Sequence, residues 1–339
     1  MSRRPVLFIT NLVAPDRVGA FAALHDALDV ELALFGGRSH HAGAGVDNPG
    51  VPHRRVSQRA VHALAASGRY RAVIGGTAGR TALPAGWLGA RWARTPFVLW
   101  SALWAPLRTP AHLLARPLMR AIYRDAAVVV AYGPHVEAFA RAHGARRVVI
   151  APQAVDNAFW AAPADGEPGR HDAFTVLFVG RDVPEKGAEV LRAAWPTTGL
   201  DEKRATLILA GPGHPAGPQS PEQLRNLYAA ADVLVIPSIA SRRFVEPWGL
   251  VVNEAMNQRT AIIATDAVGA AAGGLVRHEQ TGLVVRAGDA AALAGAIRRL
   301  HDDRALRARL AHAGADAVRA YTYEAWAAGF ATALAEVGC

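Results

Sequence analysis

Two glutamates, Glu246 and Glu254, frame a Pro-Trp-Gly turn and an apolar run in the stretch RFVEPWGLVVNEAM. The apolar run predicts a helix that begins at the turn and carries the second glutamate. Because backbone amides in the first helical turn lack partners inside the helix, those of Gly249, Leu250 and Val251 are expected to bind an anion. We expect Glu246 to lie beside the reacting part of that ligand. Glu254 would hold a polar group further along, such as a ribose diol.

Two cations follow an earlier apolar run and could act on the same ligand. In FVGRDVPEKG a strand is expected to end at Gly180, and Arg181 and Lys186 follow it on a short loop before a helix. The planar fork of an arginine and the compact charge of a lysine can converge on a diphosphate. Taken alone, this loop is equally a surface turn with solvated charges.

A second glycine-rich turn follows another apolar run, ILAGPGH at 208–214. Gly211 either lets the backbone approach a ligand closely or only makes a tight turn. The turn lacks a third glycine at the spacing of a dinucleotide fingerprint. The sequence also contains no Gly-Lys-Ser or Gly-Lys-Thr, which excludes a phosphate loop of that type.

Short apolar runs alternate with helical segments along the chain, which indicates parallel sheets with crossover helices. The expected strands of the first half lie at 5–10, 30–35, 71–76, 96–100, 126–133 and 147–152. The pattern breaks at 160–172, where turn formers and mixed charges predict a linker. Ligands of such sheets bind at the carboxyl ends of the strands.

A second series of strands and helices follows the linker. Its expected strands lie at 174–180, 205–213, 231–238, 260–266 and 281–289, and its helices at 186–195, 221–230, 249–257 and 289–314. The sequence therefore predicts two doubly wound halves, with a ligand site in the cleft between them.

The ordered motifs of the second half resemble the donor domain of retaining glycosyltransferases of the GT-B fold, glycosyltransferase family 4, also known as glycosyl transferases group 1. The resemblance is strong over 174–300 and weaker over 120–160. The motifs that carry it are FVGR with KG, ILAGPG, ADVLVIPS, EPWGLVVNEAM, AIIATDAVG and TGLVV.

This resemblance implies an α/β protein with two Rossmann-like, doubly wound domains facing a cleft. Residues 1–165 would form an acceptor-binding domain and residues 173–319 a nucleotide-sugar donor domain. The closing helix, 320–339, would pack back on the first domain.

The resemblance also implies roles for individual residues. Glu246, Arg181 and Lys186 would be catalytic. Donor contacts would come from Gly180, Arg181, Lys186, Gly211, Gly249, Leu250, Val251, Glu254 and, in the first domain, Gly19. His112 and His135 are the candidates on the acceptor side.

The implied reaction moves a sugar from a UDP- or GDP-sugar to an acceptor hydroxyl with retention. Because the sequence has no Asp-x-Asp motif for a metal ion, we expect Arg181 and Lys186 to stabilise the leaving diphosphate without a cofactor or a metal. Two alternatives stay open, a sugar-nucleotide epimerase and a non-catalytic binder of nucleotide sugars.

Composition favours a folded cytoplasmic protein. Apolar residues make up 51% of the chain, and its one cysteine, Cys339, allows no internal disulfide. Positive charge is concentrated in residues 1–160, with 19 arginines against 8 acidic residues, whereas residues 161–339 have 18 basic and 20 acidic residues. An anionic partner therefore suits the first half. No nucleic-acid-binding motif accompanies this charge.

The stretch 110–126 places Arg116, Arg120 and Arg124 four residues apart, downstream of four tryptophans. Such a stripe is typical of a helix at a membrane surface, although its leucines could equally form a core face. No apolar run is long enough to span a bilayer. We expect the protein at the inner face of the membrane, with a small-molecule, glycan or lipid-linked acceptor.

Overall fold

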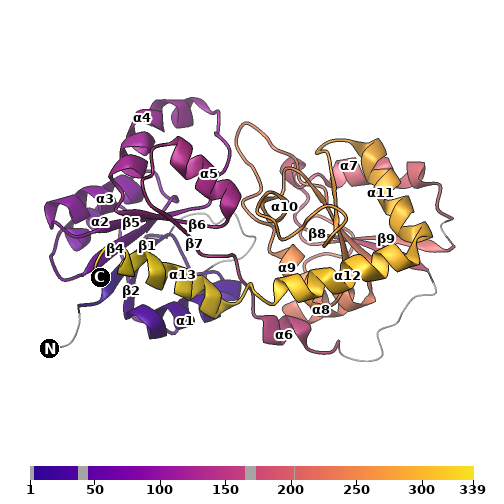
Figure 1. Ribbon diagram of the computed structural model, residues 1–339, viewed down its shortest axis with the longest axis horizontal. Helices are drawn as coiled ribbons and strands as arrows, with labels where there is room; N and C mark the ends of the chain where they lie inside the picture. Colours follow the sequence, from indigo (N-terminus) through magenta and orange to yellow (C-terminus); the bar gives the residue numbers. More distant parts are fainter. Residues whose placement is uncertain (1–3, 37–44, 165–172, 202) are drawn as a thin grey trace. The chain divides into compact units, whose positions relative to one another are not determined.

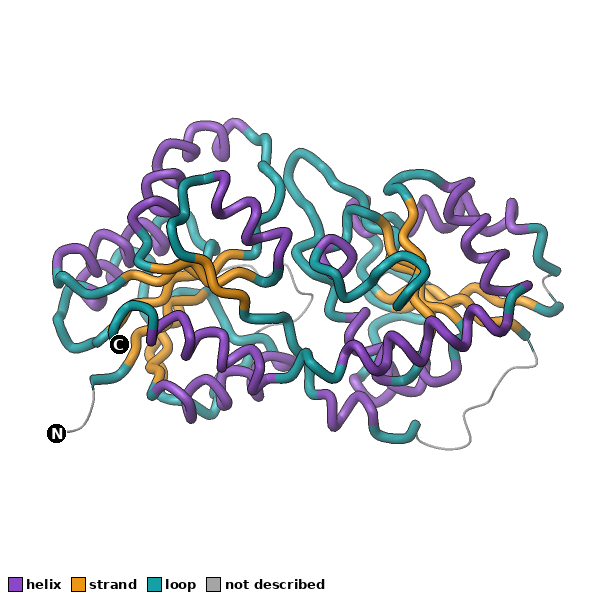
Figure 2. The backbone as a smooth tube through the Cα atoms, in the orientation of Figure 1, coloured by secondary structure: helices purple, strands orange, loops and turns teal. Residues whose placement is uncertain are grey.

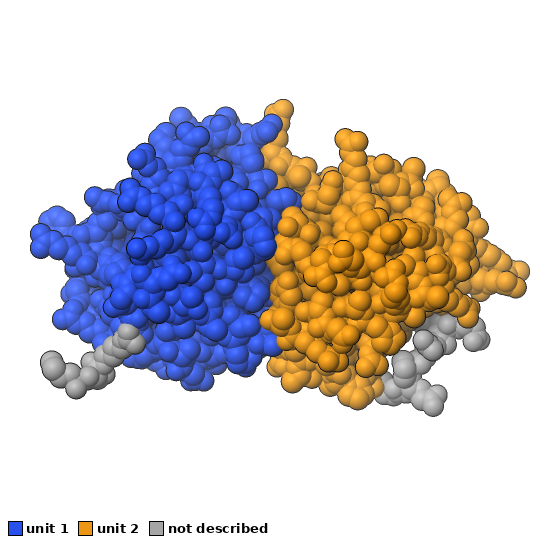
Figure 3. Space-filling model, in the orientation of Figure 1, with its two compact units in different colours: residues 1–154, 322–339 blue, residues 155–321 orange. Residues whose placement is uncertain are grey.

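The chain forms two α/β units, each built around one parallel sheet (Figures 1 and 2). Unit 1 comprises Met1–Ala154 and Thr322–Cys339, and unit 2 comprises Val155–Tyr321 (Figure 3). The computed structural model describes residues 4–36, 45–164, 173–201 and 203–339. The chain therefore passes between the units twice, after Ala154 and after Tyr321.

Unit 1 contains a seven-stranded parallel sheet in the order β3-β2-β1-β4-β5-β6-β7. This order reverses direction between β1 and β4, as in a dinucleotide-binding fold. The strands are β1 Val6–Thr10, β2 Val30–Leu34, β3 His53–Arg55, β4 Ala72–Gly76, β5 Phe97–Ser101, β6 Val128–Ala131 and β7 Val148–Ile150.

Strand β1 shows why this sheet is covered on both faces. All five of its side chains are buried. Val6 and Phe8 pack into one apolar cluster, and Leu7 and Ile9 pack into another on the opposite face. Since side chains alternate along a strand, an unbroken apolar run such as VLFI requires a helical layer on each side.

Two groups of helices supply those layers. The C-terminal helix packs beside α1, and Trp326 and Phe330 from it are fully buried in the cluster around Phe8. The other face is covered mainly by α2, α3, α4 and α5. The helices of unit 1 are α1 Val18–Leu28, α2 Ala60–Ala65, α3 Ala82–Trp92, α4 Pro110–Asp125, α5 Pro134–Ala142 and α13 Tyr323–Ala335.

Unit 2 contains a five-stranded parallel sheet in the order β12-β11-β10-β8-β9. Its first strand, β8, lies between β10 and β9, so the strand order reverses between β8 and β10. Ligands of doubly wound sheets bind at such a switch point, beyond the carboxyl ends of the strands. The strands are β8 Phe174–Val179, β9 Ala205–Ala210, β10 Val233–Ile236, β11 Ala261–Thr265 and β12 Leu283–Val285.

The helices of unit 2 include two short ones that the sequence did not predict, Asn157–Ala161 and Gly269–Ala272, and one predicted helix is divided. The predicted helix 289–314 is two helices, because the carboxylate of Asp303 accepts a 2.8 Å hydrogen bond from the amide of Leu306 and caps a new helix. The helices are α6 Asn157–Ala161, α7 Ala188–Ala194, α8 Pro221–Ala230, α9 Val251–Asn257, α10 Gly269–Ala272, α11 Ala290–Asp302 and α12 Arg304–Val318, with 3₁₀ turns at Pro184–Lys186 and Trp195–Thr198. A further 3₁₀ turn, Pro15–Arg17, belongs to unit 1.

The division between the units lies earlier than the linker that the sequence indicates. Helix α6, which the sequence assigns to the first domain, is part of unit 2. Its end is bound there by Gln258, whose amide donates to the carbonyls of Trp160 and Ala162. Residues 165–172 of the predicted linker lie outside the described residues.

Candidate active site

Lys186 is positioned by a tight loop after β8. The 3₁₀ turn Pro184–Lys186 ends at Gly187, which has a φ of 71°. A Cβ at Gly187 would overlap the carbonyl oxygen of Pro237, at the end of β10. The amide of Ile239 also donates to Glu185 O at 3.0 Å. The glycine of the KG motif is therefore required for this loop to lie against the end of β10.

Replacing Gly187 by alanine should destabilise unit 2 more than the backbone strain alone would. Gly199 has nearly the same φ, 69°, and nothing within 4 Å of a Cβ, so Gly199→Ala is the matched control. We expect Gly199→Ala to cost about 1 kcal/mol of unfolding free energy. Gly187→Ala should cost about 1–3 kcal/mol more because of the added overlap. Equal midpoints for both variants in urea titrations would contradict this account.

Lys186 and Glu246 form an ion pair at the switch point. The Lys186 ammonium donates to Glu246 Oε2, and Ser238 Oγ lies 3.3 Å from the same oxygen. The Glu246 side chain is 8% exposed and that of Lys186 is 23% exposed. The loop after β8 and the loop after β10 thus bring their charges together although 60 residues separate them.

The loop that carries Glu246 is held by the segment after β11. Gly269 N donates to Glu246 O at 3.1 Å, and Ala270 N donates to Trp248 O at 2.8 Å. A Cβ at Gly269 would overlap the Pro247 carbonyl. The motifs EPWG and DAVG therefore pack against each other.

Arg181 lies directly after β8, on a loop that packs against the turn after β9. Gly211 has a φ of 117°, and a Cβ there would overlap the Gly180 carbonyl. Asp182 N also donates to Pro212 O at 2.9 Å. The Arg181 side chain is half-buried, and among the described residues it has no ion-pair partner. Gly180 and Gly211 thus place an uncompensated guanidinium at the carboxyl end of the sheet.

A charged network braces the same two loops. The Asp182 carboxylate binds Arg192 of α7 at 3.1 Å, and Arg192 Nη2 lies 3.1 Å from Nδ1 of the buried His214. The hydrogen bond from Arg192 lowers the pKa of Asp182 below its ordinary value. This network ties the turn that contains His214 to the loop that contains Arg181.

Glu254 lies inside α9 and is buried, with 8% of its surface exposed. Tyr228 of α8 donates its hydroxyl to Glu254 Oε2 at 2.7 Å. Burial and the neighbouring carboxylate raise the pKa of Tyr228 well above its ordinary value, so the hydroxyl keeps its proton and remains a donor. The carboxylate is thus oriented by a neighbouring helix instead of lying on an exposed helical face.

Replacing Tyr228 by phenylalanine should therefore destabilise the protein through Glu254. The buried carboxylate loses a hydrogen-bond donor, which costs about 1–3 kcal/mol of unfolding free energy. Glu254→Gln in the same background should cost less than it does in the wild-type protein, because the two residues share one hydrogen bond. Additive effects in denaturant titrations of the two single variants and the double variant would contradict the coupling.

Gly249, Leu250 and Val251 lie at the start of α9, directly after the turn that precedes this helix. The first helical hydrogen bonds are donated by Val252, to Gly249 O, and by Glu254, to Leu250 O. The amides before them lack partners inside the helix. Trp248 anchors this turn, since its indole donates to Asn253 Oδ1 at 2.8 Å and the residue is only 3% exposed.

The three candidates in unit 1 have local structural partners. A Cβ at Gly19 would overlap the ring of Tyr323, whose hydroxyl donates to Asp16 O at 3.0 Å. His112 is exposed in the first turn of α4, with Nδ1 2.6 Å from Thr109 Oγ1. His135 begins α5, and its ring lies 5.4 Å from that of Trp104.

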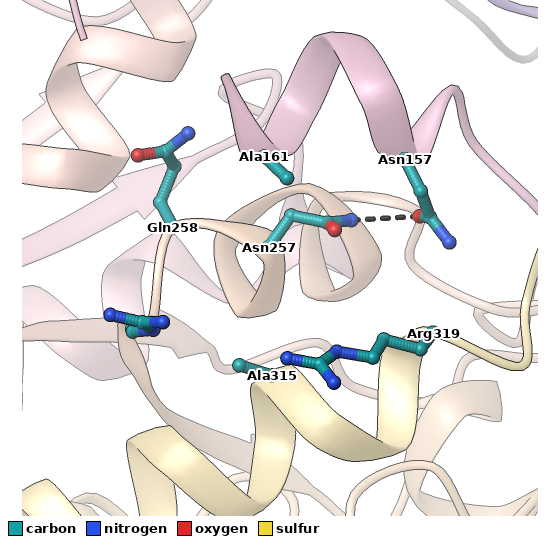
Figure 4. A pocket seen from close by; sticks show the side chains of 7 residues that line it. Asn157, Ala161, Asn257, Gln258, Ala315 and Arg319 are labelled. Carbon is teal, nitrogen blue, oxygen red and sulfur yellow. Dashed lines mark hydrogen bonds between the residues drawn. The ribbon is translucent and has the colours of Figure 1, made fainter. Parts of the chain in front are cut away.

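A separate cavity of about 390 Å³ lies at the other end of α9 (Figure 4). In it Asn257 donates to Asn157 Oδ1 at 2.8 Å. Asn157 in turn donates to the carbonyls of Val318 and Tyr321 at 3.3 and 3.4 Å. These bonds hold together the two chain segments that connect unit 2 to unit 1.

Sequence reasoning did not identify Tyr228, Ser238 or His214 as parts of the site. Ser238 ends the motif VLVIPS and His214 ends ILAGPGH, so both lie in loops that follow strands. A position directly after a predicted strand could have marked Ser238 and His214 as site residues. Tyr228 lies within an ordinary amphipathic helix, and nothing in its sequence position indicates a role in the site.

The described residues show neither a metal centre nor a helix that spans a membrane. No group of three or more histidine, cysteine, aspartate or glutamate side chains in residues 4–36, 45–164, 173–201 and 203–339 is arranged to hold a metal ion. Within the same residues, no helix combines the length and the apolar character needed to cross a bilayer.

The second half of the chain is similar to known proteins. Residues 173–303 match the family of glycosyl transferases group 1. D-inositol 3-phosphate glycosyltransferase of Streptomyces avermitilis is 33% identical over 192 residues, 45% of this chain and 39% of that protein. Phosphatidyl-myo-inositol mannosyltransferase of Mycobacterium leprae is 35% identical over 166 residues, 44% of this chain and 43% of that protein. The chain thus matches about two fifths of each relative's length.

Solved structures resemble the whole chain. The Anabaena protein Alr3699/HepE, in complex with UDP and glucose, has a TM-score of 0.77 and 19% identity, covering 98% of this chain and 100% of that one. Sucrose-phosphate synthase from Thermosynechococcus elongatus has a TM-score of 0.74 and 21% identity, covering 99% of both chains. The predicted fold class, α/β of the GT-B type with two doubly wound sheets, is confirmed.

Proposed function

We propose that the protein transfers a sugar from a nucleoside diphosphate sugar to an acceptor hydroxyl, a proposal supported by the match of residues 173–303 to glycosyl transferases group 1. One observation carries the proposal. Lys186, Glu246 and Ser238 meet at the switch point between β8 and β10, where doubly wound sheets bind ligands.

Arg181 and Lys186 bind the diphosphate of the donor. Breaking the bond between sugar and phosphate leaves negative charge on the departing diphosphate, and fixed cations that face this charge lower the barrier. An ammonium has three donor hydrogens. Lys186 can therefore stay bound to Glu246 with one hydrogen and offer the others to a phosphate.

Glu246 lies beside the transferred sugar. Positive charge develops on the sugar ring as the bond breaks, and a carboxylate held in place by Lys186 stabilises it. Glu254, oriented by Tyr228, accepts hydrogen bonds from the ribose hydroxyls. The amides of Gly249, Leu250 and Val251 donate to phosphate or sugar oxygens.

The same proposal covers the stereochemistry of transfer, the metal requirement, the donor and the acceptor. Transfer proceeds with retention, as the family resemblance implies, and the donor is a UDP- or GDP-sugar. No metal ion is needed, since two cations serve the leaving group. The family match covers residues 173–303 only, and we expect the acceptor to bind elsewhere, in unit 1. The acceptors named for the relatives are therefore not assigned to this protein. A small-molecule, glycan or lipid-linked acceptor binds to unit 1, at the inner face of the membrane.

A panel of UDP-, GDP- and ADP-sugars tests the proposal. Glycosyltransferases hydrolyse their donors slowly when no acceptor is present, and we expect free sugar and nucleoside diphosphate to accumulate from one donor. Release of an epimerised sugar nucleotide would instead indicate an epimerase. Donor binding without any turnover, with or without candidate acceptors, would indicate a binding protein.

A further inference from the structure

The cavity at the end of α9 lies at the amino-terminal edge of the sheet in unit 2. Helix α9 follows β10 and precedes β11, which pair in parallel, so the helix returns the chain from the carboxyl edge of the sheet to the amino edge. The cavity of about 390 Å³ is found where this helix ends and Arg259 leads into β11 (Figure 4). Because doubly wound sheets bind their main ligand at the carboxyl edge, a ligand in this cavity would occupy a second site.

Two arginines give the cavity a positive charge. Of the described residues that line it, Arg259 and Arg319 are basic and none is acidic. In the part of the chain that the structure describes, the Arg259 side chain has no ion-pair partner. Arg319 pairs with Asp316 at 3.4 Å, but the two side chains are 74% and 71% exposed, and such a pair contributes little. An anionic ligand is therefore the complementary occupant.

Amide side chains complete the lining, and the protein itself fixes their orientation. Asn257 donates to Asn157 Oδ1 at 2.8 Å and to a backbone carbonyl of its own helix at 2.9 Å. Gln258 donates to the carbonyls of Trp160 and Ala162. Because the N–H groups of both amides are directed at the protein, the side-chain oxygens of Asn257 and Gln258 remain as acceptors for ligand hydroxyls.

We propose that this cavity binds a small phosphate monoester that also carries hydroxyl groups, such as a sugar phosphate. We call it the α9–α12 cavity and define it by Asn157, Asn257, Gln258, Arg259 and Arg319. A phosphate monoester has a charge of about −2 at neutral pH, which two guanidinium groups match, whereas a carboxylate supplies one charge. The amide oxygens accept hydrogen bonds from the hydroxyls. This inference does not rest on the proposed function.

Asn157 connects the α9–α12 cavity with the chain segment that leaves unit 2. Its amide donates to the carbonyls of Val318 and Tyr321, and its oxygen accepts from Asn257. Arg319 lies between those two carbonyls in the sequence. A phosphate held by Arg319 therefore orders the same backbone that Asn157 holds, and binding should raise the urea concentration at which the protein unfolds.

Isothermal titration calorimetry of the full chain with ribose 5-phosphate, inorganic phosphate and ribose tests the inference. We expect ribose 5-phosphate to bind with a dissociation constant of about 1 mM or lower. Inorganic phosphate should bind more weakly, and ribose should not bind. Arg259→Gly and Arg319→Gln should each weaken ribose 5-phosphate binding about 10-fold or more, since each removes charge-assisted hydrogen bonds.

Arg94→Gly is the matched control for Arg259→Gly. Arg94 follows α3 as Arg259 follows α9, and their φ values are 54° and 56°. Both substitutions remove one charge and one left-handed arginine, so both variants should unfold at urea concentrations at least as high as the wild-type protein. Only Arg259→Gly should lose binding. Arg304→Gln, at an exposed position of α12, is the corresponding control for Arg319→Gln.

The site is also separable from the proposed donor site. Lys186→Ala should bind ribose 5-phosphate like the wild-type protein, and Arg259→Gly should bind UDP like the wild-type protein. The inference would be overturned if the wild-type protein did not bind ribose 5-phosphate, or if Arg94→Gly lost as much binding as Arg259→Gly. Loss of binding in Lys186→Ala but not in Arg259→Gly would also overturn it, because the phosphate would then lie at the donor site.

Discussion

Replacing Lys186 by alanine will lower the rate of sugar transfer about 100-fold or more, the usual effect of removing one donor that stabilises transition-state charge. The loss should appear mainly in kcat, because charge on the diphosphate grows as the glycosidic bond breaks. It should also leave Glu246 buried without its cation. Steady-state kinetics with the active donor measure the effect.

The chain offers an unusually clean control for this experiment. Lys203 is the only other lysine, and it is exposed in the turn before β9. Lys203→Ala should therefore transfer sugar at the wild-type rate. Arg181→Ala should resemble Lys186→Ala, since both cations serve the leaving group. Near-normal turnover in both the Arg181 and the Lys186 variants would remove these side chains from the proposed site.

Replacing Glu246 by glutamine will abolish most transfer while leaving nucleotide binding intact. The amide keeps the shape of the side chain but lacks the charge that stabilises the developing positive charge on the sugar, a loss of about 100-fold in rate. Nucleoside diphosphate should bind as tightly as before or more tightly, because Lys186 no longer shares its charge with a carboxylate. Titration calorimetry and transfer kinetics on the same preparation measure the two effects.

Glu222→Gln serves as the control, since Glu222 is an exposed acid in the first turn of α8. It should change neither binding nor transfer. If Glu246→Gln instead weakens nucleotide binding in proportion to the loss of rate, Glu246 acts only by holding Lys186. Its place beside the sugar would then be wrong.

The strands and their loops, apart from the short β3, could be predicted because their signals are local. Apolar runs ending in Gly180 or at Ser238 mark strand ends, and the ordered motifs lie within residues 173–303, which match glycosyl transferases group 1. No local sequence pattern shows which strands lie side by side in the folded sheet. The strand order places β10 beside β8, although β9 lies between them in sequence. The ion pair of Lys186 with Glu246 follows from that order and could not be predicted from residue spacing.

Other features were hidden for similar reasons. A glutamate in a helix is usually exposed, and only the packing of α8 on α9 places Tyr228 against Glu254. Gly19 lies against the ring of Tyr323, about 300 residues away in sequence, a neighbour that no local pattern predicts. The exposure of Leu114 likewise depends on how α4 packs, since its spacing fits a core face equally well.

A crystal structure with a bound nucleoside diphosphate such as UDP will show where the donor binds. We expect the pyrophosphate within hydrogen-bond distance of Arg181 and Lys186, with the ribose hydroxyls on Glu254. A pyrophosphate bound elsewhere, away from Lys186 and Glu246, would contradict this expectation.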